Sequence, residues 1–115
     1  MKLVDFGIQN LTKNCNETLI LSVLAQGRKH GYQLALEIEE RSTGLFKFNH
    51  GPLYPILHKL EKEGFIKGVW KQEGPKRQRK YYTITAKGKK YTVAQTEQWR
   101  NFLNRFFDIV GDPES

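Results

Sequence analysis

The 115-residue sequence predicts an α+β fold that is mostly helical, with three short helices, then a β-hairpin, then one long helix. Two observations carry this prediction. Apolar residues recur at the three- and four-residue spacing of a buried helix face in three segments before residue 64, and again after Thr85. Between these segments lie two stretches rich in β-branched and aromatic residues, separated by a turn that contains Gly74 and Pro75.

The first helix is expected to begin after Asn14, because Glu17 follows it at the spacing of a capping box. Leucine, isoleucine and valine then recur on one face, up to a stop at Gly27. A second helix is expected from about His30, which serves as its cap, to Ser42. Its apolar positions are Tyr32, Ala35, Leu36 and Ile38.

The third helix is expected over residues 51–63, with a one-sided apolar stripe that anchors it to the core. The stripe comprises Leu53, Ile56, Leu57 and Leu60. Pro52 and Pro55 fall in the first turn, where proline is tolerated and fixes the direction in which the chain enters the helix. The preceding segment holds Phe46 and Phe48, which we expect to pin the connection to the core.

Residues 65–71 and 80–85 are expected to form the two strands of the hairpin. The cations at its tip are Lys76, Arg77 and Arg79. Thr85 is a natural N-cap for the last helix, and the run from Gly111 to Pro113 stops it.

The formal net charge of the chain is +7, and the excess lies in one segment. Residues 65–90 hold nine lysines and arginines against one acid, Glu73. A basic patch on an otherwise balanced chain indicates a polyanionic partner, nucleic acid ahead of an anionic membrane surface. The plain alternative is a solvated basic surface without a partner.

The longest apolar run, residues 18–25, is far too short to span a bilayer, and no secretory signal is visible. The single cysteine, Cys15, cannot form an internal disulfide. We therefore expect a cytoplasmic protein without a membrane partner. A redox function for Cys15 stays open beside its plainer interpretation as a small apolar residue near the surface.

Three short helices followed by a basic hairpin are the order of a winged helix-turn-helix, in which the third helix enters the major groove of double-stranded DNA and the hairpin, or wing, follows the backbone. We expect one domain over residues 1–115, with a DNA-binding part at 12–85 and a dimerisation helix at 86–110. The expected DNA contacts on the third helix are Asn49, His50, Leu53, Tyr54, His58 and Lys59. Those on the wing are Lys76, Arg77, Arg79 and Lys80. Wing contacts with phosphate release counterions, and Leu53 could touch a thymine methyl group.

Local stretches resemble the PadR family of bacterial and archaeal transcriptional regulators over about residues 17–90. HGYQL begins the second helix, LYPILHKLEKEG lies on the third, and KYYTITAKG covers the second strand of the wing, in the order found in the family. The resemblance implies a dimeric repressor of genes for detoxification, efflux or related stress responses, released by a small ligand or stress signal. It also implies that Tyr54 faces DNA. Two departures are Pro52, where the family usually has threonine, and a more cationic wing tip.

The last helix carries an aromatic stripe that we expect to form a homodimer interface, together with the N-terminal segment. Its members are Trp99, Phe102, Leu103, Phe106 and Phe107. Exposed, these side chains would promote aggregation, whereas a dimer would place two third helices about 34–36 Å apart for a palindromic operator. Burial against the protein's own core is the plainer alternative. Multidrug-sensing relatives bind ligands on tryptophans of this helix, which implies Trp99 as part of a pocket for a small aromatic or cationic effector.

The sequence predicts no enzyme, no metal site and no cofactor. His30, His50 and His58 lack the spacing and the companion ligands of a metal site. No nucleophile–base pair, paired carboxylates or glycine-rich nucleotide loop is visible. Two alternatives to a sequence-specific regulator stay open: an adaptor whose basic hairpin docks on an acidic protein, and a protein that coats nucleic acid without sequence preference.

Overall fold

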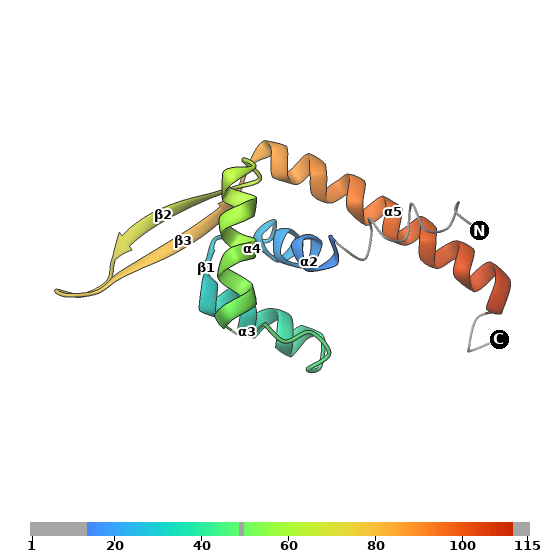
Figure 1. Cartoon of the computed structure of the whole chain (residues 1–115), viewed down its shortest axis with the longest axis horizontal. Coiled ribbons are helices and arrows are strands. Elements are labelled where there is room, and N and C mark those ends of the chain that lie inside the picture. Colours follow the sequence, from blue (N-terminus) through green and yellow to red (C-terminus); the bar gives the residue numbers. More distant parts are fainter. Residues whose placement is uncertain (1–13, 49, 112–115) are drawn as a thin grey trace.

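The computed structural model describes residues 14–48 and 50–111 (Figure 1). Its elements are α2 (Cys15–Leu24), β1 (Lys29–His30), α3 (Gly31–Arg41), α4 (His50–Lys62), β2 (Ile66–Gln72), β3 (Gln78–Ile84) and α5 (Ala86–Val110). The predicted order of three helices, hairpin and long helix is confirmed. The arrangement is that of a winged helix-turn-helix with a long C-terminal helix.

Helices α2, α3 and α4 enclose the hydrophobic core. The most deeply buried side chains are Ile20, Leu21, Leu24, Leu34, Leu53, Leu57 and Leu60. The stripe predicted for α4 is therefore confirmed as its core face, and Phe46 and Phe48 pack against this core as expected. The predicted face of α3 is wrong in part, because Tyr32 is 60% exposed and Leu36 is 42% exposed. Leu34 and Ile38, four residues apart, are the positions of α3 that face inward.

Two of the three predicted helix caps are present. The backbone N–H of Gln33 donates to Nδ1 of His30 at 3.1 Å, which caps α3. The N–H of Gly88 likewise donates to Oγ1 of Thr85 at 3.0 Å, which caps α5. The capping box at the start of α2 is wrong, since Asn14 makes no side-chain cap hydrogen bond.

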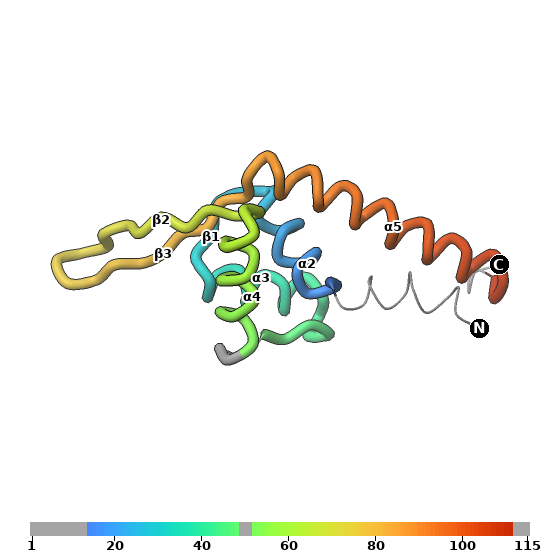
Figure 2. Tube along the Cα trace, turned by 45° about the horizontal axis from the view of Figure 1, so that its top comes forward, coloured from blue at the N-terminus to red at the C-terminus, as the bar shows by residue number. Residues whose placement is uncertain are grey.

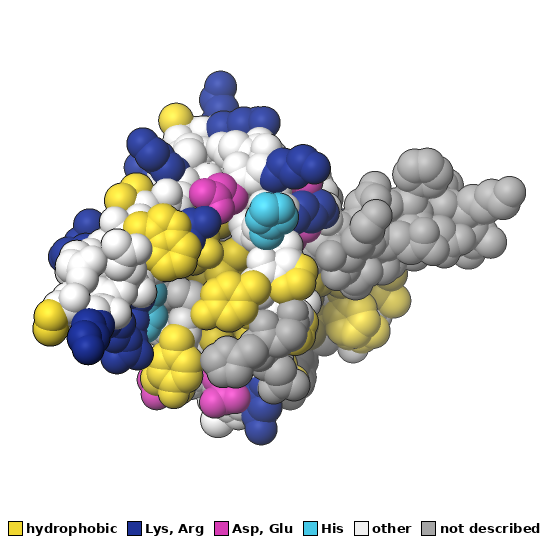
Figure 3. Space-filling model, turned by 60° about the vertical axis from the view of Figure 1, so that its left-hand side comes forward, with side chains coloured by type: hydrophobic (Ala, Val, Ile, Leu, Met, Phe, Trp, Pro, Cys, Tyr) yellow, Lys and Arg dark blue, Asp and Glu magenta, His cyan; other side chains and the backbone are white. Residues whose placement is uncertain are grey.

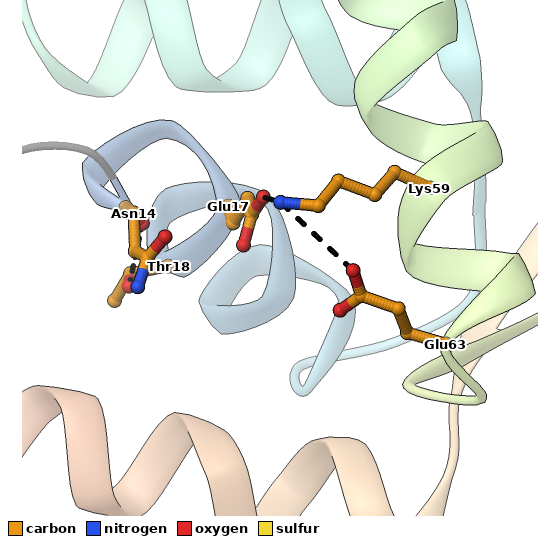
Figure 4. Close-up of polar contacts among 5 residues, drawn as sticks. All are labelled: Asn14, Glu17, Thr18, Lys59 and Glu63. Carbon is orange, nitrogen blue, oxygen red and sulfur yellow. Dashed lines mark hydrogen bonds and ion pairs between the residues drawn. The ribbon is translucent and has the colours of Figure 1, made fainter. Parts of the chain in front are cut away.

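Glu17, the expected second member of that box, is instead used for a long-range contact. Its side chain is buried, and its Oε1 accepts a hydrogen bond from Nζ of Lys59 at 2.7 Å (Figure 4). A buried carboxylate needs a charged or hydrogen-bonding partner, and an ammonium from α4 satisfies this need better than an exposed backbone amide. The ion pair therefore joins α2 to α4.

The strands form one antiparallel sheet in the order β1-β3-β2. Strand β1 was not predicted, and it pairs Lys29 with Tyr82 and His30 with Tyr81, which ties the segment before α3 to the hairpin. The hairpin is closed at its tip by the N–H of Glu73, which donates to the carbonyl oxygen of Arg77 at 2.7 Å. It extends from the helical body as a wing, at the end opposite the last turns of α5 (Figure 2).

Helix α5 begins where the sheet ends and packs against α2, and its buried residues are Gly88, Thr92 and Gln95. Its C-terminal half extends past α2 (Figure 1). The N–H of Gly111 donates to the carbonyl oxygen of Phe107 at 2.8 Å, and Gly111 has a φ of 83°, so the predicted glycine stop is confirmed. Within the described ranges, no helix is long and apolar enough to cross a membrane.

Candidate nucleic-acid interface

A groove of about 670 Å³ separates α4 from the wing. Its α4 side is formed by Tyr54, His58 and Glu61, and its wing side by Trp70, Arg77, Arg79, Lys80 and Tyr82. Residues at the start of α3 close one end. We call this the α4–wing groove. It brings the predicted contacts Tyr54 and His58 opposite three of the four predicted wing cations.

Tyr54 lies near the N-terminus of α4, and 46% of its surface is exposed. Its ring lies against Gly31, the first residue of α3. A Cβ atom at Gly31 would lie 3.2 Å from Cε1 of the tyrosine and 3.3 Å from its hydroxyl oxygen. The glycine of the HGYQL stretch therefore allows the tyrosine of the LYP stretch to lie close over the start of α3.

Leu53 is wrong as a base contact, because its side chain is only 2% exposed and belongs to the core. Leu53 belongs to the apolar stripe that anchors α4 to the core, and a side chain buried there cannot also contact a base. Asn49 lies outside the described residues. His50 begins α4, and its side chain also lies outside the described part of the chain.

Lys59 contacts α2 and not the α4–wing groove. Its Nζ lies 2.7 Å from Oε1 of Glu17 and 3.9 Å from Oε1 of Glu63 (Figure 4). The hydrogen bond to Glu17 is the main reason why the pKa of Lys59 is raised. Lys59 therefore joins α4 to α2, and the expected DNA contact at this half-exposed side chain stays a prediction.

The cations at the wing tip differ in their surroundings. Neither Lys76 nor Arg77 forms an ion pair with an acid of the described residues. Arg79 is held on both sides, since its Nη1 lies 3.1 Å from Nε2 of His30 and its Nε lies 3.8 Å from Oε2 of Glu73. The two tip cations are therefore available to an external anion, whereas Arg79 is placed by its neighbours.

His30 was expected only as a helix cap, but it also orients the wing. Besides capping α3 and contacting Arg79, its ring meets the Tyr81 ring edge-on, with centroids 5.6 Å apart. Burial, reinforced by the charge of Arg79, holds the pKa of His30 below its usual value. The position of this histidine directly before α3 gave a signal for the cap, but its pairing with β3 and its contact with Arg79 depend on distant residues that the spacing does not identify.

Trp70 was also missed. It is 63% exposed, lines the groove and lies opposite Lys80 in the hairpin register. A tryptophan followed directly by Lys71 in a strand of the basic hairpin was the sequence signal for a surface aromatic contact. Figure 3 shows this side of the molecule, with cationic side chains around an apolar area and fewer acidic ones.

The groove thus offers cations for phosphate and aromatic rings for sugars or bases, which is the chemistry of a nucleic-acid interface. In the part of the chain that the structure describes, no group of three His, Cys, Asp or Glu residues could hold a metal ion.

Comparison with known proteins agrees with this architecture. The family model described as the transcriptional regulator PadR-like family matches residues 20–94. The negative transcriptional regulator PadR of Bacillus subtilis is 36% identical over 70 residues, which are 61% of this chain but only 38% of that protein.

Among solved structures, a transcriptional regulator from Clostridium thermocellum is similar with a TM-score of 0.78 and 30% identity, over 88% of this chain and 95% of its own. Bacillus subtilis PadR in complex with operator DNA has a TM-score of 0.65 and 31% identity, over 70% of this chain and 45% of its own. The chain therefore belongs to the PadR-like family, whose members are transcriptional regulators and not enzymes.

Proposed function

We propose that this protein is a sequence-specific DNA-binding repressor that acts in the cytoplasm as a homodimer. The observation that carries the proposal is the α4–wing groove, which combines an exposed tyrosine and histidine on α4 with the wing cations Arg77, Arg79 and Lys80. Bacillus subtilis PadR is described as a negative regulator and was solved with operator DNA, so the similarity to it supports DNA as the binding partner and repression as the effect.

In this proposal α4 enters the major groove with its first turns. Tyr54 and His58 then face base edges or sugars, and the positive end of the helix dipole lies near phosphate. Lys76 and Arg77 reach the backbone beside the major groove, where they neutralise phosphates and supply affinity without reading sequence.

The second copy is proposed to bind along α5. The exposed apolar side chains of this helix include Val93, Leu103, Phe106, Phe107, Ile109 and Val110. Trp99 and Phe102 pack edge to face on the same stretch, with centroids 5.9 Å apart. Exposed apolar side chains in this number on one helix are typical of an isologous dimer interface, and twofold symmetry matches a palindromic operator.

The proposal includes release by a small planar aromatic or cationic effector that stacks on Trp99. In a Trp70→Phe variant only Trp99 emits, and we expect an acridine dye to quench this emission with a saturable curve and to dissociate the operator complex. Quenching that rises linearly, as for free tryptophan, would contradict the effector site. A Trp99→Phe variant controls for dye that binds elsewhere.

A gel-shift assay on the DNA upstream of the gene, at two salt concentrations and against a shuffled duplex of equal length, tests the main proposal. A repressor of this type binds the natural duplex more tightly than the shuffled one at both salt concentrations. Equal affinity for both would indicate a nucleic-acid-coating protein, and no shift at either salt would favour an adaptor that binds an acidic protein.

Neutralising the wing tip with Lys76→Gln and Arg77→Gln should weaken binding to every duplex. Removing two phosphate contacts should reduce the slope of log affinity against log salt by about 1.8, or roughly 30-fold in affinity at 0.15 M salt. Arg105→Gln, a single charge change on the C-terminal half of α5, should leave the slope unchanged. An unchanged slope in the double variant would remove the tip from the interface.

A further inference from the structure

Lys80, which the sequence predicts as a DNA contact, makes its contacts inside the protein. Its Nζ lies 2.9 Å from Oε1 of Glu61, which joins β3 of the wing to α4. The same ammonium lies 5.8 Å from the centre of the Trp70 ring and 5.4 Å from that of Tyr82. The Lys80 side chain is only 26% exposed, and its ammonium faces Glu61, which also lines the α4–wing groove.

Gly68 on β2 provides the path for this side chain. A Cβ atom at Gly68 would overlap Cε of Lys80 and would lie 3.0 Å from Oε2 of Glu61. The stem of Lys80 therefore crosses β2 directly over the bare glycine and meets the carboxylate on the other side. Any larger residue at this position would displace the ammonium from Glu61.

Glu61 is an acidic residue on the face that we propose binds DNA, where a negative charge is unexpected. Unpaired, it would repel phosphate and weaken binding. The hydrogen bond from Lys80 is the largest influence that holds its pKa below the usual value, and the Gly68 backbone and His58 act in the same direction. The carboxylate is therefore charged at neutral pH, with the charge compensated inside the groove.

We propose that Lys80 and Glu61 form a strut that fixes the angle between the wing and α4, so that Lys80 is a positioning residue and not a phosphate contact. This inference rests on the proposed DNA-binding function. A protein that contacts a duplex with two elements binds most tightly when the relative position of these elements is fixed before binding, because ordering them during binding costs affinity. The hairpin extends from the body on two strands, and the strut is a direct side-chain link from it to α4.

The sign of the effect of Glu61→Gln distinguishes a strut from a phosphate contact. If Lys80 were a phosphate contact, this variant would strengthen DNA binding, because it removes an acid and frees the lysine. If the pair is a strut, the variant weakens operator binding, by roughly two- to fivefold, although it makes the face more positive.

Lys80→Gln should weaken binding by a similar factor and leave the salt slope unchanged, whereas a lost phosphate contact lowers the slope by about 0.9. Lys76→Gln at the wing tip is the matched control, and it should show this lower slope. The double variant Glu61→Gln/Lys80→Gln should bind no worse than either single variant, because both remove the same link. Tighter binding by Glu61→Gln, or a lower slope for Lys80→Gln, would overturn the strut.

Thermal melting of each variant excludes loss of folding as the cause. Should either single variant melt well below the wild type, the charge-reversed pair Glu61→Lys/Lys80→Glu gives the answer: a strut is restored by reversal, and a phosphate contact is not. A wild-type protein that binds no duplex in the gel-shift assay would refute the proposed function itself, and this outcome is distinct from every outcome that overturns the strut.

Discussion

If the proposed homodimer forms through α5, replacing Phe106 with aspartate should give monomers and weaken binding to a palindromic operator by roughly 10²–10⁴-fold. Phe106 is 47% exposed and packs against the Phe107 ring, with centroids 5.4 Å apart. In an isologous interface each substitution occurs twice, so two carboxylates would lose water without a partner. The monomer would keep its contacts with one half-site and lose the gain from binding both.

Analytical ultracentrifugation measures the mass, and gel shifts on a half-site and on the full operator measure the coupling. The variant should bind the half-site as the wild-type monomer unit does, and only the full operator should show the loss. Asn101→Asp adds the same charge about 140° away around α5 and should stay dimeric. If Phe106→Asp remains a dimer, the proposed interface on this face is wrong.

Features that depend on local pattern were predicted well. The periodic leucines of α4, the two β-rich segments and the cap at Thr85 each specify an element through their own neighbours. The grouping of cations on the hairpin is also local, because residues in one hairpin stay together in any fold. For these reasons the architecture and the placement of the cations on the wing follow from the sequence.

Features that depend on distant partners were not predicted. Lys59 and Lys80 both look like exposed cations in the sequence, yet each is paired with an acid on another element. Their partners, Glu17 and Glu61, are 42 and 19 residues away, and nothing in the spacing identifies them. Strand β1 was missed for the same reason, because its two residues become a strand only through pairing with β3.

The three stretches that resemble the PadR family meet at the junction of α3, α4 and the wing. His30 of the HGYQL stretch contacts Arg79, which directly precedes the KYYTITAKG stretch. Gly31 of HGYQL lies under Tyr54 of the LYPILHKLEKEG stretch. The second and third are joined again where Oγ1 of Thr85 donates to the carbonyl oxygen of Gly64 at 2.6 Å. Much of what these stretches specify is therefore the packing that sets the wing against α4.

Replacing Gly88 with alanine should destabilise the fold, although alanine normally favours a helix by about 1 kcal/mol over glycine. A Cβ atom at Gly88 would overlap the carbonyl oxygen of Phe65 and would lie 2.8 Å from Cγ1 of Ile84. That carbonyl oxygen also accepts a hydrogen bond from the N–H of Thr85 at 3.0 Å, so it cannot simply move aside. Overpacking costs about 1–3 kcal/mol or more. We expect a net loss of about 2 kcal/mol and a fall in Tm of roughly 8–16 °C.

Gly68→Ala is the matched control, because there the three atoms nearest to the new methyl group all belong to the side chains of Lys80 and Glu61. A flexible lysine can swing away, so this variant should melt within a few degrees of the wild type while it loses the strut and part of its affinity for DNA. Gly88→Ala should show the reverse order of effects, with a large loss in Tm measured by circular dichroism. Equal melting of the two variants would contradict the close contact of Gly88 with the carbonyl group of Phe65. With the expected results, Gly88→Ala measures what the contact between α5 and Phe65 contributes to stability, and Gly68→Ala measures what the Lys80–Glu61 pair contributes to the position of the wing.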